Sequence, residues 1–296
     1  MIFRKLKLDA VNRAVTTLDG AAGKSVNVAK VLKALGERPV AVGFLCDDRG
    51  ESLRSVLEAR GIECDFVQVT ARTRQCITVI DESAGAITEL VEESQPVAAT
   101  DYDALLATFR KRIRGCRGLV MSGTLTPGGP ADFYFHCTQI GKEAGALSVV
   151  DAQGAALIEA LKAGPGLVKP NRLELAATVG RALPDERARM SAMRELHARG
   201  AQQVVVTAGK EPTLAFDGRR FWRVRGPRIA AVNPIGSGDA FTAALVWRLL
   251  RGEDLGEACR WASAAGAANA LTTMAGEVDP QEAERLVKVV AVEAVE

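Results

Sequence analysis

Paired cysteines, histidine and long apolar runs are scarce in this chain of 296 residues, and each scarcity excludes a class of protein. The six cysteines form no CxxC pair, which argues against a zinc site or a disulfide framework and favours core thiols. The two histidines, His136 and His197, lie in helical-looking stretches and are predicted to be surface or packing residues. No apolar stretch is long enough to cross a bilayer and the N-terminus lacks a signal-peptide core, so a cytoplasmic protein without membrane contact is expected.

The composition that remains is that of an ordinary globular protein. Hydrophobic residues make up 48% of the chain and charged residues 25%, enough for one large α/β domain or two modest ones. The net charge is +2 and the sequence has no concentrated basic face, so nucleic acid is not an expected partner. From residue 97 onward, apolar strands alternate with helices. This pattern is typical of a doubly wound, mostly parallel sheet with ligands at the carboxyl ends of its strands.

A buried strand at Val40–Leu45 and a helix at Glu51–Arg60 form a first β-α unit, but the rest of the first hundred residues shows a different pattern. Five short strand-like segments lie there, with no helix between the last three: Ile2–Leu8, Asn12–Leu18, Cys64–Val69, Gln75–Ile80 and Ala86–Val91. They predict a small antiparallel sheet apart from the main one, with the role of a lid. This division assigns residues 2–18 and 64–96 to the lid, and residues 19–63 and 97–296 to the main nucleotide- and substrate-binding domain.

The stretch VNPIGSGDAFTAALVWRL, residues 232–249, carries the strongest sign of chemistry. A Gly-Ser-Gly turn at 236–238 runs into an apolar helix, so amides without intrahelical partners point out of the helix start. These amides and the helix dipole form an anion site that suits a phosphate. Asp239 in the first turn is a fixed carboxylate that accepts a proton. The anion site and this carboxylate together suit phosphoryl transfer to a hydroxyl. A plain turn and helix cap is the structural alternative.

Two further motifs offer polar groups to a ligand. The Gly-Lys-Ser tripeptide at 23–25 lacks the earlier glycine and the leading strand of a P-loop. Lys24 and Asn27 are therefore interpreted either as substrate ligands or as a solvated lysine and a capping asparagine. Asn171 and Glu174 begin a helix at i and i+3, which suits either a helix cap or the ordering of hydrated magnesium.

Seven motifs, in order, carry a resemblance to a known family. They are VNRA at 11–14, AGKSVNVAKVL at 22–32, TRQCITVID at 73–81, SGTLTPGGPADFY at 122–134, KPNRLEL at 169–175, VNPIGSGDAFTAAL at 232–245 and GAANALT at 266–272. The chain resembles the PfkB (ribokinase-like) carbohydrate kinases over nearly its whole length, and most of all the 1-phosphofructokinase and tagatose-6-phosphate kinase members. The resemblance implies a ribokinase-like three-layer α/β/α fold with a small β-sheet lid. Family members often dimerise through that lid, which covers its open edges.

The resemblance also implies a reaction and a set of residues. The reaction is ATP-dependent phosphorylation of the primary hydroxyl of a ketohexose phosphate, with magnesium as cofactor and a homodimer formed through the lid. The implied roles are Asp239 as the base; the amides of Gly236, Ser237 and Gly238 on the transferred phosphoryl group; Lys24, Asn27, Arg74, Ser122 and Gly123 on the sugar phosphate; Lys169, Thr207, Gly209 and Asn269 on ATP; and Asn171 and Glu174 on magnesium through water. For Arg74, the local pattern alone favours an exposed strand residue.

Two departures from the family pattern bear on the substrate. The GGKG-like sugar loop of the family reads Ala-Gly-Lys-Ser at 22–25, which narrows the backbone freedom and adds a hydroxyl. Related chains begin with a buried strand that ends in an NPALD-like turn, and this sequence starts after that point. Either the start is trimmed, or a central strand and one substrate contact are missing, with lower stability or altered substrate binding as the expected result.

The sequence also leaves two other functions open. A non-catalytic sensor of a sugar phosphate or nucleotide fits the altered N-terminus, but such a sensor needs no acceptor base at residue 239. A PfkB kinase for an unphosphorylated sugar or nucleoside is the second, but a neutral sugar does not call for two cations such as Lys24 and Arg74. The sequence leaves fructose 1-phosphate, tagatose 6-phosphate and fructose 6-phosphate as equal candidates for the acceptor.

Overall fold

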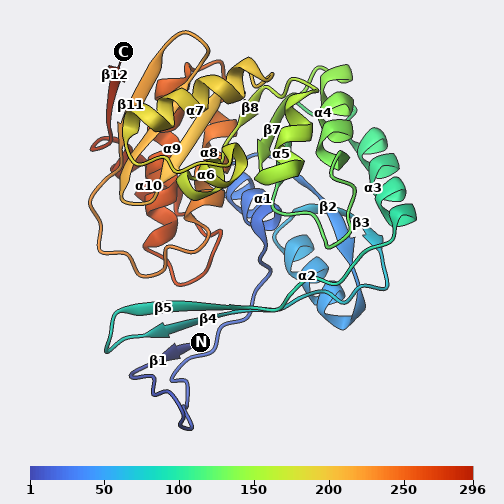
Figure 1. The fold of residues 1–296 in the computed structure, drawn as a ribbon. Coiled ribbons are helices and arrows are strands. Elements are labelled where there is room, and N and C mark those ends of the chain that lie inside the picture. The colour runs from blue at the N-terminus through green and yellow to red at the C-terminus, as the bar shows by residue number, and fades with distance from the viewer. Residues whose placement is uncertain (296) are drawn as a thin grey trace.

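Seven strands form the main sheet of the computed structural model, which describes residues 1–295 (Figure 1). Their order is β12-β11-β10-β9-β8-β7-β6, parallel from β6 to β9 and antiparallel from β9 to β12. The strands are β6 (Gly118–Ser122), β7 (Leu147–Asp151), β8 (Leu167–Val168), β9 (Val204–Ala208), β10 (Glu211–Phe216), β11 (Phe221–Arg225) and β12 (Ala291–Val295). The predicted α/β fold class, with a main sheet and a separate small sheet, is confirmed.

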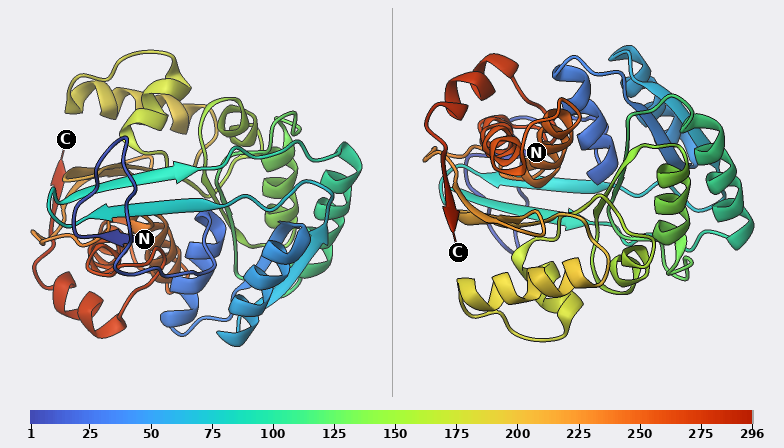
Figure 2. Two further views of the ribbon diagram at one scale, coloured as in Figure 1. Left: turned by 90° about the horizontal axis from the view of Figure 1, so that it is seen from below. Right: turned by 90° about the horizontal axis from the view of Figure 1, so that it is seen from above.

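Helices cover both faces of this sheet, which gives three layers (Figure 2). The helices are α1 (Lys24–Ala34), α2 (Asp47–Ala59), α3 (Ala99–Arg112), α4 (Phe133–Glu143), α5 (Gly154–Leu161), α6 (Arg172–Val179), α7 (Glu186–Ala198), α8 (Ser237–Leu249), α9 (Leu255–Ala270) and α10 (Pro280–Val287). Successive strand residues point to opposite faces, so Val204 and Val206 pack with α3 to α7 while Val205 packs with α1 and α8 to α10. Each face thus has its own apolar core.

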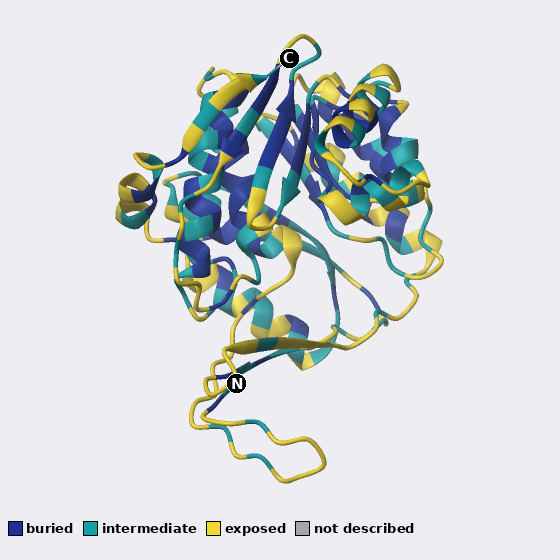
Figure 3. Cartoon of the chain, turned by 60° about the vertical axis from the view of Figure 1, so that its left-hand side comes forward, coloured by how far each residue is buried: buried dark blue, intermediate teal, exposed yellow. Residues whose placement is uncertain are grey.

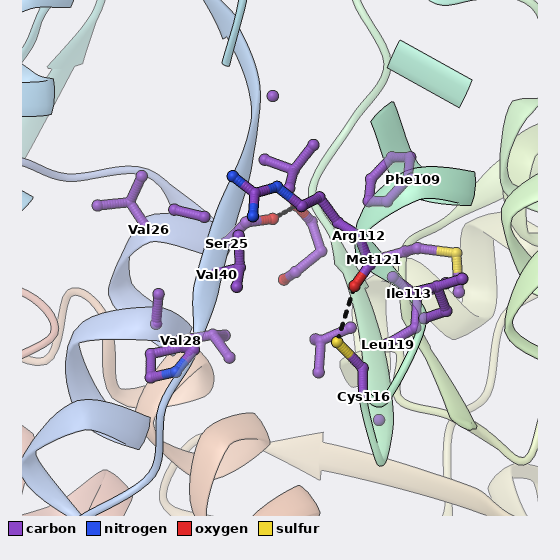
Figure 4. A pocket seen from close by; sticks show the side chains of 18 of the residues that line it. Ser25, Val26, Val28, Val40, Phe109, Arg112, Ile113, Cys116, Leu119 and Met121 are labelled. Carbon is purple, nitrogen blue, oxygen red and sulfur yellow. Dashed lines mark hydrogen bonds between the residues drawn. The ribbon is translucent and has the colours of Figure 1, made fainter. Parts of the chain in front are cut away.

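The strands β2 (Val40–Leu45) and β3 (Glu63–Gln68) form a separate parallel pair. Within residues 1–295, β2 pairs only with β3, and β6 pairs only with β7. A cavity of about 620 Å³ lies between β2 and β6, and apolar side chains from α1, α3 and α8 also line it (Figure 4). Within the described residues, the main sheet therefore ends at β6 on this side, and β2 and β3 stand apart from it.

A three-stranded sheet of β1 (Ile2–Phe3), β4 (Cys76–Asp81) and β5 (Ala86–Val91) projects from the body, and much of it is exposed (Figures 1 and 3). The strands β4 and β5 are antiparallel as predicted, but β1 is parallel to β4. A strand at Asn12–Leu18 was wrongly predicted, because only a single bridge from Ile2 to Thr16 forms there. The segment Cys64–Val69 was also wrongly placed in the lid. It belongs to β3, since the helix α2 returns the chain beside β2 in a β-α-β crossover.

The cysteines and helices bear on two other expectations. All six cysteines are free, and Cys137 and Cys259 are buried as predicted for core thiols, whereas Cys76 is exposed on β4. The prediction of a core thiol is therefore wrong for Cys76, because the lid has no second layer to bury it.

Among the helices of residues 1–295, none combines the length and the hydrophobicity that crossing a membrane requires.

Candidate active site

The start of α8 presents two unpaired amide groups. Gly236 precedes the helix in the left-handed region at φ 85°, a conformation that glycine adopts without strain. The amides of Ser237 and Asp239 already donate to Pro234 O and Gly236 O, each over 3.1 Å. The amides of Gly236 and Gly238 have no acceptor within the described residues. The helix dipole adds positive potential at the same place, so this turn can bind an anion.

Asp239, in the first turn of α8, is only 7% exposed. The side-chain amide of Asn27 donates a hydrogen bond of 2.7 Å to its Oδ2. Burial raises the pKa of Asp239 to about 6, and the charge of Asp151 adds to the rise, while the Asn27 hydrogen bond and the ammonium groups of Lys169 and Lys24 oppose it. A carboxylate with this pKa is ionised at neutral pH and accepts a proton more readily than an ordinary aspartate.

A network of alternating charges faces Asp239. Asp151, at the end of β7, lies 3.0 Å from Lys169 Nζ and accepts a hydrogen bond of 2.9 Å from Thr242. Lys24 Nζ lies 3.9 Å from Asp151 Oδ1 and 3.1 Å from Glu174 Oε1. Burial alone would lower the pKa of Lys24, but the two carboxylates outweigh it and the pKa is raised. Lys24 is therefore a charged group that two acids hold beside the catalytic candidate.

Sequence reasoning missed Asp151 and Thr242. Asp151 ends a buried strand, and the carboxyl ends of parallel strands are where this class of fold binds its ligands, so its position was a usable signal. Thr242 lies one turn after Gly238 and was hidden within an apolar helix pattern. Asp151 is only 2% exposed, and the ammonium groups of Lys169 and Lys24 offset the cost of burying its carboxylate.

Asn171 and Glu174 form a complete capping box at the start of α6. Asn171 Oδ1 accepts from the amides of Leu173 and Glu174, each over 2.9 Å, and Glu174 Oε2 accepts from the Asn171 amide over 2.8 Å. The capping alternative for this motif is therefore realised. It leaves Glu174 Oε1, which lies against Lys24, directed away from the cap.

The donor set here suits a hydrated magnesium ion better than one held by protein ligands alone. Within residues 1–295, no group of three or more acidic, histidine or cysteine side chains is placed to enclose a metal. Two carboxylates, Asp151 and Glu174, approach the same Lys24 ammonium, so the region is rich in acidic oxygen. Magnesium usually keeps several waters and binds one or two carboxylates together with substrate phosphates, which is the arrangement that these residues fit.

Two buried polar atoms near Lys24 have no partner. Asn27 Oδ1 and Ser122 Oγ are buried and accept or donate no hydrogen bond within the described chain. The hydroxyl of Ser25 donates to Ser122 O over 2.9 Å, which ties the start of α1 to the end of β6. Gly123 continues from there at φ 120°, near the Lys24 side chain. Unpaired buried polar atoms are costly, so Asn27 and Ser122 are suited to a ligand with hydroxyl groups.

The four predicted nucleotide contacts have different surroundings. Lys169 is 3% exposed and paired with Asp151, while Thr207 forms a bridge with Asn171 at the end of β9. Gly209 turns the chain between β9 and β10 at φ 63°. Asn269 is fully buried, and its amide donates to Ile235 O over 2.9 Å while its oxygen accepts from the Gly276 amide over 2.8 Å. The side chain of Asn269 thus braces the loops around the anion site.

Arg74 stands apart from the other predicted residues. It is exposed just before β4, and among residues 1–295 no hydrogen bond or ion pair links it to another side chain. The other predicted residues, by contrast, come from α1, the strand ends of β6, β8 and β9, the starts of α6 and α8, and the end of α9, and hydrogen bonds or ion pairs link several of these segments. The structure therefore brings Lys24, Asn27 and Asp239 together but leaves Arg74 on the lid.

Comparison with known proteins finds a matching family model and several similar structures. The chain matches the family model described as "pfkB family carbohydrate kinase" over residues 2–282. Phosphofructokinase-2 from Escherichia coli, solved in complex with substrates and products, is 26% identical, with 97% of this chain and 94% of that chain covered and a TM-score of 0.88. A putative phosphofructokinase from Staphylococcus aureus is 26% identical, with 100% and 94% covered and a TM-score of 0.80. A possible 1-phosphofructokinase from Thermotoga maritima shares the fold at 22% identity, with 100% and 95% covered and a TM-score of 0.91.

Proposed function

This chain belongs to the pfkB family of carbohydrate kinases, and from that premise we propose that it transfers the γ-phosphoryl group of ATP to the primary hydroxyl of a ketohexose phosphate. The observation that carries the proposal is that free amides at Gly236 and Gly238 and the buried carboxylate of Asp239 lie in the same helix turn. An anion site and a proton acceptor in the same helix turn serve the two needs of this reaction.

Asp239 acts as the base in this proposal. Its pKa of about 6 keeps it ionised at neutral pH, and the hydrogen bond from Asn27 leaves one carboxylate oxygen, Oδ1, for the acceptor hydroxyl. The base need not be strong, because phosphoryl transfer passes through a loose transition state in which the acceptor proton leaves late. The amides of Gly236 and Gly238 stabilise the charge on the transferred group, with Ser237 contributing through the turn that it forms with Pro234.

The proposed acceptor carries a phosphate because the site offers a partly exposed cation next to unpaired polar atoms. Lys24 is 41% exposed, so its ammonium can leave Glu174 for a phosphate, and Asn27 Oδ1 and Ser122 Oγ can take sugar hydroxyls with Gly123 beside them. Arg74 would join them from the lid. Similar proteins have phosphofructokinase in their names, and the E. coli phosphofructokinase-2 has been solved with fructose-6-phosphate.

ATP and magnesium are assigned mainly to residues at the ends of β8 and β9 and at the start of α6. Lys169 is the cation for the nucleotide phosphates, and Thr207 and Gly209 line the approach from β9, while Asn269 acts by holding the anion loop. Glu174 would hold magnesium through water with its Oε1, and Asn171, whose Oδ1 already accepts two backbone amides, would contribute by fixing Glu174 in the cap and by donating its side-chain amide to a water. The ion would supply positive charge to the phosphates.

The lid is the proposed dimer surface. The strand β5 lies at the edge of the three-stranded sheet and exposes the apolar side chains of Leu90 and Val91. Exposed edges of this kind are usually covered, and a second copy of the lid would cover it. A Leu90→Lys variant should shift a dimer to a monomer in analytical ultracentrifugation, and an unchanged sedimentation coefficient would contradict this interface.

The function is tested by ADP release in a coupled assay with ATP, magnesium and each of three acceptors. The acceptors are fructose 1-phosphate, fructose 6-phosphate and tagatose 6-phosphate, with fructose as the unphosphorylated comparison. Turnover with one phosphorylated acceptor, lost in Asp239→Asn but kept in Asp103→Asn, is the expected result, because Asp103 is an exposed aspartate on α3. Binding of ATP or a sugar phosphate without turnover of any acceptor would favour the sensor instead, and turnover of fructose alone would favour the kinase for an unphosphorylated sugar.

A further inference from the structure

Lys30 is a buried ammonium group that the proposed chemistry does not use. It lies on α1, three residues after Asn27, and is only 4% exposed. Its Nζ donates to Ala275 O over 2.7 Å and to Ala21 O over 3.1 Å, and lies 3.1 Å from Glu277 Oε1. A buried lysine is costly, and burial lowers the pKa of this one, so these partners are what keep it charged in the interior.

The segment that Lys30 holds, residues 275–277, is wedged between two parts of the active site. A Cβ atom on Gly276 would lie 2.8 Å from Asn27 Cα and from Asn27 Oδ1. A Cβ atom on Gly236 would lie 2.8 Å from both Ala275 Cβ and the Gly276 nitrogen. The backbone at 275–276 therefore touches the helix that carries Asn27 on one side and the anion turn on the other.

Both contacts lead to Asp239. Asn27 donates directly to the Asp239 carboxylate, and Gly236 opens the helix turn that contains Asp239. Asn269 also fixes this segment, since it accepts from the Gly276 amide and donates to the carbonyl oxygen of Ile235, the residue before Gly236. A shift of residues 275–277 would thus move the hydrogen-bond partner of the base and the anion site together.

We propose that Lys30 is a positioning residue for phosphoryl transfer, which fixes residues 275–277 so that the Gly236 turn and Asn27 keep Asp239 aligned with the phosphoryl group. The inference rests on the proposed function, because alignment of a base and an anion site has value only for a transfer reaction. A displacement of about 1 Å at such a site can cost about a hundredfold in rate. Lys30 touches neither substrate nor ATP in this account, and acts through backbone carbonyls.

The experiment compares Lys30→Met with three other variants at a temperature where each is more than nine-tenths folded. Lys30→Arg restores a cation with a different shape. Arg60→Met removes the other partner of Glu277, which lies 2.7 Å away, and leaves the carbonyl contacts of Lys30 in place. Leu196→Ala creates a cavity in the other core, on α7, as a control for lost stability alone.

We expect Lys30→Met to lower kcat at least tenfold while the KM for the sugar phosphate stays within threefold of the wild type. Lys30→Arg should recover part of kcat, and Arg60→Met and Leu196→Ala should keep it within threefold. Wild-type kcat in folded Lys30→Met, or an equal loss of kcat in Leu196→Ala, would overturn the positioning role.

Amide hydrogen exchange provides a readout that does not depend on turnover. In Lys30→Met, the amides of Ile235, Asp239 and Gly276 should exchange faster, because this variant loses the hydrogen bond to Ala275 O. Arg60→Met keeps that hydrogen bond, so its exchange at these amides should not change. Unchanged exchange at these amides refutes the proposal. If Lys30→Met does not fold, the same comparison is made with Lys30→Arg. If the wild type phosphorylates no acceptor, the kinase function fails while the exchange data still decide whether Lys30 holds the loop.

Discussion

Asn27 and Asp239 are 212 positions apart in the chain and joined by a hydrogen bond of 2.7 Å between Asn27 Nδ2 and Asp239 Oδ2. The bond links α1 to the first turn of α8 within the buried part of the site. It stabilises the ionised carboxylate and so works against burial, which raises the pKa of Asp239. The balance of these two effects sets the pH range in which the proposed base is ready to accept a proton.

The rate should therefore depend on pH with an acid limb near 6. Above pH 6 Asp239 is ionised and able to take the acceptor proton, and below pH 6 protonation removes the base. We expect kcat/KM to fall about tenfold for each pH unit well below this value. The measurement is kcat/KM from pH 4.5 to 8.5 with whichever of the three acceptors supports turnover in the coupled assay. A rate that stays constant down to pH 5 would show that Asp239 is not the base.

Replacement of Asn27 by alanine should move this limb to higher pH. The variant loses the hydrogen bond that lowers the pKa of Asp239, while burial remains. A hydrogen bond to a charged group contributes roughly 1.5–3 kcal/mol, so a shift of about one pH unit or more is expected. The pH profile of Asn27→Ala beside the wild type measures it. A shift to lower pH would mean that Asn27 does not stabilise the charged form.

The pKa of Asp239 also predicts how stability varies with pH. An aspartate whose pKa rises from 3.8 to about 6 on folding binds protons more tightly in the native state, so its cost to stability is absent below pH 4 and complete above pH 6. The free energy of unfolding should fall with rising pH across this window, by on the order of 3 kcal/mol from this group. Urea unfolding of the wild type and of Asp239→Asn isolates the effect, since the difference between the two should grow from pH 4 to pH 6. A constant difference contradicts the raised pKa.

Much of the fold and part of the site were predictable because short-range patterns determine them. The glycine turn at 236–238 before an apolar helix, and the Asn171–Glu174 cap, depend only on neighbours in sequence and were both located correctly. Buried strands such as Val204–Ala208 can be recognised in the sequence by their apolar runs. Where a residue's role depends only on its own segment, the sequence contains the information.

The failures share a different cause, which is dependence on distant partners. The strand β3 looks like a lid strand in isolation, and only the return of the chain through α2 pairs it with β2. The strand β12 went unpredicted because it is short and contains a glutamate, Glu293, which is tolerated at the sheet edge because it pairs with Arg223. Lys30 resembles any lysine on a surface helix, and its burial follows from carbonyl groups at residues 21 and 275. A single sequence does not show which segments meet in this way.

Gly236→Ala should impair the site by both backbone strain and steric overlap. The left-handed conformation costs a residue with a side chain about 1–2 kcal/mol, and the new Cβ would lie 2.8 Å from Ala275 Cβ. Displacement of an amide from the anion site lowers the rate on the order of a hundredfold. Gly252→Ala is the matched control, because Gly252 has φ 82° with no atom within 4 Å of the added Cβ. Equal kcat in the two variants would contradict a special role for Gly236.

The cavity beside β2 makes a final prediction about local stability. Among the strands of residues 1–295, β2 has a hydrogen-bonded neighbour on one side only, while β9 is flanked by β8 and β10. Each absent ladder bond removes about 1 kcal/mol of net stabilisation, and the apolar side chains that face the cavity lack packing partners on that side. The unit of β2, α2 and β3 should therefore open without unfolding the rest of the molecule. Hydrogen exchange followed by mass spectrometry should show the amides of residues 40–45 exchanging at least tenfold faster than those of residues 204–208. Equal protection of the two strands would mean that the packing of α1 and α3 alone makes β2 as stable as the centre of the main sheet.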